Sequence, residues 1–262
     1  MAFVRVIMIG DVVGNPGLTA LEQALPGLIK EYDAALVVVN GENAAEGFGL
    51  SETTFQRILA AGADVVTSGN HVWEKREFWP ILDTDSRILR PANYPQGNPG
   101  QGWVRLEKAG ASWLVVNLQG RELMTPLDCP FKTFDGIPAA LAEDLILVDF
   151  HAESTREKEA LAYYLDGRVS LLVGTHTHVQ TADERVLPQG TGYITDLGMT
   201  GVLEGIIGMD TRICLDRARN QVLYRMECAL GAGVVQGIIA EIDAATGKAA
   251  WIQRVTTPAL NN

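Results

Sequence analysis

The stretch VSLLVGTHTHVQTAD, residues 169–183, joins a short apolar run to a pair of histidines. The apolar run ends at Gly174, and its length predicts a buried strand rather than a helix. His176 and His178 follow at once, so the end of this strand would project two imidazoles from one short piece of backbone. Imidazole binds divalent transition metals, and such a pair can hold one ion or two adjacent ions. Taken alone, the pair fits ordinary hydrogen-bonding histidines equally well.

Polar side chains that can bind metals also follow the other apolar strands that the sequence predicts. Ligands of α/β proteins gather beyond the carboxyl ends of the strands, which meet at one edge of the sheet. The predicted strands, paired with the segments that follow them, are Val4–Ile9 with Gly10-Asp11, Leu36–Val39 with Asn40-Gly41-Glu42-Asn43, Val65–Thr67 with Ser68-Gly69-Asn70-His71, and Leu145–Phe150 with His151.

Helical patterns alternate with these strands. Apolar residues recur at helical spacing over residues 18–29, but Pro26 interrupts them, which predicts a kinked helix or two consecutive short ones. Ser51 is expected to cap a helix that ends at Gly62. The repeated order of strand, polar turn and helix predicts an α/β fold whose first sheet is largely parallel.

The remaining half of the chain predicts more strands. Asn117–Ile137 is long and lacks periodicity, so it is either functional or disordered. No linker composition divides the chain, and we expect residues 1–262 to form a single domain, whose later strands form a second, more antiparallel sheet packed on the first. Two hairpins are predicted, Gly102–Lys108 with Ser112–Leu118 and Val234–Ile242 with Ala249–Thr256.

Composition narrows the classes of function. With 262 residues, 47% of them hydrophobic, the chain can bury a full core. Its net charge of −11 argues against binding to duplex DNA or an anionic membrane, because both would repel the protein. The chain shows no apolar window long enough to span a membrane and no signal peptide. Its three cysteines form no CxxC pair, as expected of a cytoplasmic protein with reduced thiols.

The four histidines of the chain all lie at or near predicted strand ends. Asp11, Glu42, Asn43 and Asn70 occupy equivalent positions. Together these residues offer imidazole, carboxylate and carboxamide without thiolate, a set suited to iron, manganese or zinc in hydrolysis. One metal ion would not need so many ligands, so the sequence predicts two ions that share a carboxylate.

With these motifs in view, the sequence resembles the calcineurin-like metallophosphoesterases, and more narrowly their YmdB-like bacterial branch. The usual first block, Asp-x-His, has Val13 in place of the histidine, and Glu42 stands where a bridging Asp is usual. At both positions the sequence resembles the motifs of the YmdB-like branch, whose members hydrolyse cyclic nucleotides, including 2′,3′-cyclic ones. The motifs that carry the resemblance are GD (10–11), NGEN (40–43), GNHVW (69–73), FH (150–151) and GTHTHVQTAD (174–183).

The resemblance implies a sandwich of two sheets flanked by helices and a site with two transition-metal ions, iron or manganese above all, with zinc as an alternative. A shared carboxylate, that of Glu42, would bridge the ions. The remaining ligands that the resemblance implies are Asp11, Asn43 and His178 for one ion and Asn70, His151 and His176 for the other.

The same resemblance assigns His71 to the substrate rather than to a metal. A hydroxide that bridges the ions would attack phosphorus directly, and His71 would protonate the departing ribose oxygen. Related enzymes often orient this histidine with an acidic residue directly after it, but Val72 stands there, and Glu74 is the available substitute. The expected substrate is a small phosphodiester such as a 2′,3′-cyclic or 3′,5′-cyclic nucleotide.

Two other functions fit the same residues. A phosphomonoesterase, either a nucleotidase or a protein phosphatase, would use the same metal core. A non-catalytic, metal-stabilised regulatory scaffold would not need His71. Oligomeric state cannot be read from the sequence, so a homo-oligomer stays open. Weaker candidates for the pocket are Asn117, Arg121, Glu153, Thr181 and Asp196, and the aromatic candidates for base stacking are Phe131, Phe134 and Tyr193.

Overall fold

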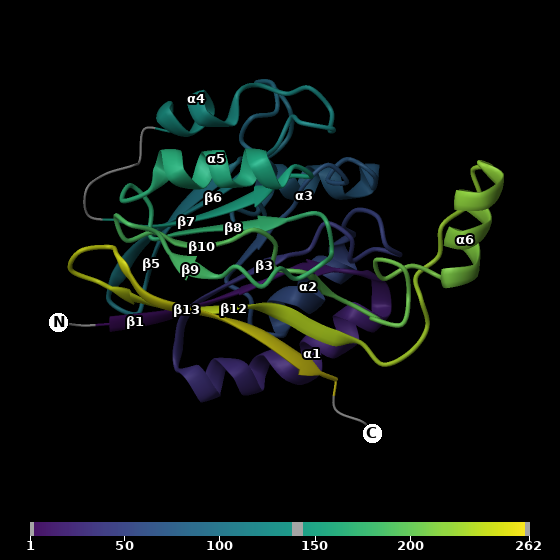
Figure 1. Cartoon of the computed structure of the whole chain (residues 1–262), viewed down its shortest axis with the longest axis horizontal. Coiled ribbons are helices and arrows are strands. Elements are labelled where there is room, and N and C mark those ends of the chain that lie inside the picture. Colours follow the sequence, from purple (N-terminus) through teal and green to yellow (C-terminus); the bar gives the residue numbers. More distant parts are fainter. Residues whose placement is uncertain (1–2, 138–143, 260–262) are drawn as a thin grey trace.

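The computed structural model describes residues 3–137 and 144–259, which form two sheets packed face to face with helices outside both (Figure 1). In the first sheet, β1 (Phe3–Ile9), β3 (Ala34–Asn40) and β4 (Val65–Thr67) run parallel. Beside β1, the terminal hairpin of β12 (Val234–Asp243) and β13 (Ala249–Pro258) pairs antiparallel. The strand order is β13-β12-β1-β3-β4.

The second sheet has a parallel centre. Its order is β5-β6-β7-β8-β10-β9, and β6, β7, β8 and β10 are parallel neighbours. Antiparallel pairing is confined to its two edges. The strands are β5 (Trp103–Lys108), β6 (Ala111–Gln119), β7 (Leu145–His151), β8 (Leu171–Thr175), β10 (Gly192–Ile194) and β9 (Arg185–Val186).

The prediction that the later strands form a more antiparallel second sheet was therefore wrong in one respect. The terminal hairpin belongs to the first sheet, where it covers the edge of β1. The physical reason is that Val6–Ile9 is buried on both faces, and such an apolar strand must have partners on both sides. The middle of β12, residues 237–240, is continuously buried as well, as is usual for an inner strand.

The alternation of side chains along each strand builds three apolar layers. Ile7 and Val37 face the helices α1 (Gly14–Tyr32) and α2 (Glu52–Ala60), whereas Val6 and Leu36 face the other sheet. The second sheet repeats this arrangement: Val115 faces inward, and other side chains pack on α5 (Thr155–Leu165) and α4 (Pro130–Asp135). The order of layers is helix, sheet, sheet, helix (Figure 1).

One of the two predictions about the first helices is confirmed, and the other is confirmed in part. Ser51 caps α2 through a capping box with Thr54, as the sequence predicts. One helix, α1, runs through Pro26, so the alternative of two short helices was wrong. Pro26 lies on the exposed side of α1, where the carbonyl that loses its partner can bond to water. The unpatterned stretch Asn117–Ile137 contains the short helix α4.

Five further elements complete the fold. The strand β2 (Asp11–Val12) pairs with β11 (Met199–Thr200), and a 3₁₀ turn (Arg76–Phe78) leads into α3 (Trp79–Thr84). No pattern in the sequence predicts α6 (Thr211–Asn220), which has no buried residue and stands away from both sheets (Figure 1). Among the described residues, no helix combines the length and the apolar character that a membrane span requires.

Candidate metal centre

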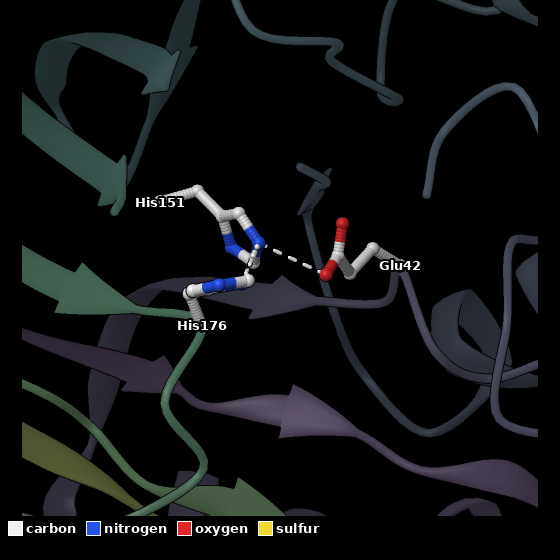
Figure 2. Close-up of side chains that lie close together, drawn as sticks. All are labelled: Glu42, His151 and His176. Atoms are coloured by element: carbon white, nitrogen blue, oxygen red, sulfur yellow. Dashed lines mark hydrogen bonds and ion pairs between the residues drawn. The ribbon is translucent and has the colours of Figure 1, made fainter. Parts of the chain in front are cut away.

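The carboxyl ends of strands from both sheets meet at one place. Asp11 and Glu42 follow β1 and β3 of the first sheet, while His151 ends β7 of the second sheet. These three side chains are fully buried. Figure 2 shows the imidazoles of His151 and His176 beside the carboxylate of Glu42. The predicted cluster of strand-end side chains is thus brought together, but its members come from two sheets rather than from one.

Four of the predicted ligands surround one point, and we call them the His151 group. The Nε2 atom of His151 lies 2.9 Å from Oε1 of Glu42, 3.0 Å from Oδ1 of Asn70 and 3.0 Å from Nδ1 of His176. The nearest ligand atoms of Glu42, His151 and His176 all lie within 4.8 Å of one another. This spacing allows one metal ion to bind all three side chains.

The other predicted ligands form a second set beside the first, which we call the His178 group. Asn43 lies at its centre: its Nδ2 atom is 3.1 Å from Nε2 of His178, 3.4 Å from Oδ1 of Asp11 and 3.3 Å from Oε1 of Glu42. The amide of an asparagine can be turned over, which would bring its oxygen to the position of its nitrogen. The oxygen Oε1 of Glu42 therefore lies in both groups.

The charges of this cluster favour a cation. Burial opposes protonation of His151, but the carboxylates of Glu42 and Asp11 raise its pKa to about 9. Burial would raise the pKa of Glu42, yet His151 lowers it to about 2. His151 therefore carries a proton at neutral pH, and that proton supplies positive charge between buried carboxylates. Burial, together with the nearby charge of His151, lowers the pKa of His176 to about 3, so its imidazole is neutral and can donate a lone pair.

The loop of the two histidines is held in an unfavourable backbone conformation. His176 has φ of 101° and His178 has φ of 65°, both in the region that side chains rarely adopt. The backbone N–H of His176 donates to Asp11 at 3.2 Å, and that of Thr177 donates to Asp196 at 3.1 Å. These hydrogen bonds stabilise the turn that aims both imidazoles at the cluster.

The outer ring nitrogens of the histidines are also fixed. The Nδ1 atom of His178 lies 2.8 Å from the carbonyl of Ile207, which can only accept, so Nδ1 carries the proton and Nε2 is free to bind. On His151, Nδ1 contacts Thr175 at 2.9 Å, and the Thr175 hydroxyl donates to Asp149 at 2.7 Å. Both arrangements point Nε2 into the cluster.

Two buried side chains support the loop from below. The Nζ atom of Lys158 on α5 donates to Oδ2 of Asp196 at 2.7 Å, and neither side chain is exposed. The backbone N–H of Gly198 donates to the other oxygen of Asp196 at 2.9 Å. From the sequence, Asp196 is marked only by its position after a strand, and Lys158 is not marked at all, because the pattern of its helix gives no sign of a buried charge.

His71 lies beside the cluster with different neighbours. Its backbone N–H donates to Oε2 of Glu42 at 3.1 Å, while its ring Nδ1 lies 3.4 Å from Oε1 of Glu74. The ring also meets Phe48 edge to face, with centroids 5.0 Å apart. The structure thus places Glu74 where it can orient His71.

The weaker candidates have mixed positions. Glu153 lies 3.2 Å from Nε2 of His176, so it borders the cluster. Asn117 is buried and accepts from the backbone of Ser68, which is a structural role. Phe134 and Tyr193 are core residues and are too buried to stack on a base.

The two-sheet fold with this cluster of histidine, carboxylate and carboxamide side chains defines the class, that of the calcineurin-like phosphoesterases. The chain belongs to the family described as YmdB-like protein, whose model matches residues 7–255. Over 253 residues, 96% of each chain, it is 45% identical to the 2′,3′-cyclic-nucleotide 2′-phosphodiesterase of Bacillus subtilis (strain 168).

Two solved structures are similar over nearly their whole length. One is a hypothetical protein from Thermus thermophilus, with a TM-score of 0.90, 41% identity, and coverage of 98% of this chain and 100% of the other. The other is a novel phosphatase from Mycoplasma pneumoniae, with a TM-score of 0.92, 32% identity, and coverage of 98% and 94%. The expected sandwich of two sheets flanked by helices is confirmed.

Proposed function

We propose that this protein is a dinuclear-metal-dependent phosphodiesterase that hydrolyses cyclic nucleotides, both 2′,3′-cyclic and 3′,5′-cyclic. The observation that carries the proposal is the position of Glu42 Oε1, which lies 2.9 Å from Nε2 of His151 and 3.3 Å from Nδ2 of Asn43. One carboxylate oxygen thus faces both ligand groups, as a bridge between two ions requires. The similarity to a cyclic-nucleotide phosphodiesterase supports the choice of substrate.

The residues present fit two transition-metal ions. The donors are imidazole, carboxylate and carboxamide, which suit iron and manganese and also zinc. The proton that Glu42 and Asp11 stabilise on His151 supplies the positive charge that an ion would replace. The His151 group would hold one ion, and the His178 group the other. When bound, two such ions supply an activated water for in-line attack on phosphorus.

The side chains around the ions have separate tasks. Glu153 and Asp11 help to fix His176, through contacts at 3.2 Å with its ring Nε2 and with its backbone N–H. His71 would hold the proton that the leaving ribose oxygen takes up, and Glu74 would orient the ring through Nδ1. The attacking water would give one proton to solvent and join phosphorus through its oxygen, the bond to the ribose oxygen would break, and the proton of His71 would complete the new hydroxyl.

The surroundings of the enzyme form part of the proposal. We propose that residues 1–262 act as a single domain in the cytoplasm. We expect neither duplex DNA nor a membrane as a partner, because the net charge of −11 would be repelled by both. Contact between copies of the chain would cover apolar side chains that residues 203–230 expose. Those side chains are Leu203, Ile206, Ile207, Leu215, Val222, Leu223, Tyr224 and Leu230.

A substrate panel tests the function. Purified protein would be reconstituted with Fe²⁺, Mn²⁺ or Zn²⁺ and assayed on 2′,3′-cyclic AMP, 3′,5′-cyclic AMP and 4-nitrophenyl phosphate. We expect faster turnover of the cyclic diesters, with elemental analysis giving about two ions per chain. Faster turnover of 4-nitrophenyl phosphate would favour a phosphomonoesterase, and no turnover at any metal loading would favour the regulatory scaffold.

A further inference from the structure

A cavity of about 1060 Å³ opens beside His71 and reaches residues 203–231, which we call the arm. The arm carries α6, which stands away from the sheets (Figure 1). Its returning segment lines the far wall of the cavity through Arg225, Met226, Glu227, Cys228 and Leu230. Pockets that hold small ligands usually measure about 300–1,000 Å³. The cavity therefore has room for more than one mononucleotide.

The wall next to His71 suits a nucleoside. Phe48 is half-buried, and its ring contacts that of His71 edge to face at an interplanar angle of 76°. Pro16, Met226 and Leu230 add accessible apolar surface to the lining. A nucleoside whose ribose oxygen faces His71 would thus find an aromatic ring and aliphatic groups beside it.

At the solvent-exposed side of the cavity, two cations converge on one oxygen atom. The Oε2 atom of Glu46 lies 3.6 Å from Nζ of Lys75 and 3.8 Å from Nη2 of Arg225. Lys75 belongs to the loop of His71, whereas Arg225 belongs to the arm, so the pair spans the cavity. The Glu46 carboxylate occupies a position between them that suits an anion.

The contacts of Glu46 are weak enough to be exchanged. Its side chain is 76% exposed and that of Arg225 is 85% exposed, and ion pairs this exposed to solvent contribute little to stability. A phosphate offers more oxygens and a stronger charge to the same two cations. The preference for an anion is confined to the position between Lys75 and Arg225, because basic and acidic residues are equal in number over the whole lining. The basic residues are Arg57, Lys75, Arg217 and Arg225, and the acidic ones are Glu46, Glu74, Glu77 and Glu227.

We propose that Lys75 and Arg225 form a second phosphate subsite, which receives a phosphate on the 5′ oxygen of the cyclic nucleotide in exchange for Glu46. The preferred substrates are then 2′,3′-cyclic phosphates that also bear a 5′-phosphate, either as a single nucleotide or at the end of an oligoribonucleotide. This inference rests on the proposed function, because the cavity begins at His71, where the leaving ribose oxygen would lie.

Three substrates test the subsite on the metal-loaded enzyme: adenosine 2′,3′-cyclic phosphate, the same compound with a 5′-phosphate, and the dinucleotide ApA with a 2′,3′-cyclic end. We expect kcat/KM to be about tenfold higher for at least one of the 5′-phosphorylated forms, because two charge-assisted contacts are added. A gain only for the single nucleotide identifies a terminal phosphate as the ligand, and a gain for the dinucleotide identifies an internucleotide phosphate. Equal kcat/KM for all three substrates would overturn the subsite, whereas no turnover of any would contradict the proposed function itself.

Variants test the named residues through the ratio of kcat/KM between extended and simple substrate. Within one variant this ratio does not depend on the amount of folded protein. We expect K75M and R225M to lower the ratio and E46Q to raise it, because E46Q removes the competing carboxylate. R212M, which removes a charge from α6 outside the lining, serves as the matched control and should keep the ratio of the natural protein. A ratio that survives the double substitution K75M/R225M would overturn the assignment.

Discussion

Lys158 Nζ lies 2.7 Å from Asp196 Oδ2, and the pair is fully buried beneath the loop of His176 and His178. The same Asp196 oxygen accepts from the backbone of Thr177, between the two histidines. Removal of one partner from a buried pair leaves an uncompensated charge. The pair therefore links the stability of the fold to the geometry of the candidate metal centre.

Replacement of Lys158 should damage both properties. We expect K158M to lower the free energy of unfolding by about 3–5 kcal/mol and to weaken metal binding, because Asp196 then loses its counter-charge. Urea denaturation and metal titration calorimetry measure the two effects. In the double variant K158M/D196N the loss of stability should be smaller than the sum of the single losses. Metal affinity that is unchanged in K158M would show that the pair supports only the fold.

Glu42 and His178 should differ in their effects on metal content. Glu42 Oε1 faces both groups, so E42Q should reduce binding from about two ions to about none, whereas H178A should keep the ion of the His151 group. Elemental analysis after gel filtration measures the stoichiometry. Equal losses in the two variants would contradict a bridging role for Glu42.

His71 should matter for turnover but not for metal content. We expect H71A to retain both ions and to lose about 10²–10⁴-fold in kcat, the usual contribution of a general acid. E74Q should have a smaller effect in the same direction, since Glu74 only contacts the ring at 3.4 Å. If H71A is purified without metal, the proton-donor role is wrong and His71 belongs among the ligands.

Metal affinity should rise with pH. In the metal-free protein the pKa of His151 is raised to about 9 by Glu42 and Asp11, so a metal ion must displace a proton at neutral pH. Below that pKa the apparent affinity should increase about tenfold per pH unit, and it should level off above it. Below about pH 6 the ions should be released, because histidine ligands must be neutral to bind. Chelator competition across the pH range measures this dependence, and a flat profile would contradict it.

The glycine before Asn70 is required by close packing. A Cβ atom on Gly69 would overlap the imidazole of His151, so G69A should displace that ring and reduce metal content. The matched control is G27A, since a Cβ there meets nothing within 4 Å. In the exposed part of α1, Ala should stabilise the protein by about 0.5–1 kcal/mol relative to Gly, with metal content unchanged. Normal metal content in G69A would mean that His151 is not a ligand.

Much of the fold and of the cluster could be predicted because both follow from local patterns. A buried strand followed by a ligand residue can be recognised from a few adjacent letters, as at Leu145–His151. The contact of Lys158 with Asp196 could not be predicted, because it joins residues 38 positions apart and depends on how α5 packs. The helix α6 was missed because its large apolar residues, Ile213, Cys214 and Leu215, are consecutive and do not recur at helical spacing, and none of them is fully buried.

The division of the candidate ligands between the two sheets has a mechanical consequence. Glu42 follows a strand of one sheet and His151 ends a strand of the other, so their spacing depends on how the sheets pack. The apolar side chains between the sheets set that packing, together with polar contacts such as Asn40 Nδ2 to Asp149 Oδ2 at 3.1 Å. The packing of the core between the sheets therefore determines the distance between the ligands of the candidate metal centre. Replacement of a core side chain such as Leu171 by a smaller one would change the distance between the two ligand groups, although the residue lies in the core between the sheets. This change would occur at a loss of stability too small to unfold the protein.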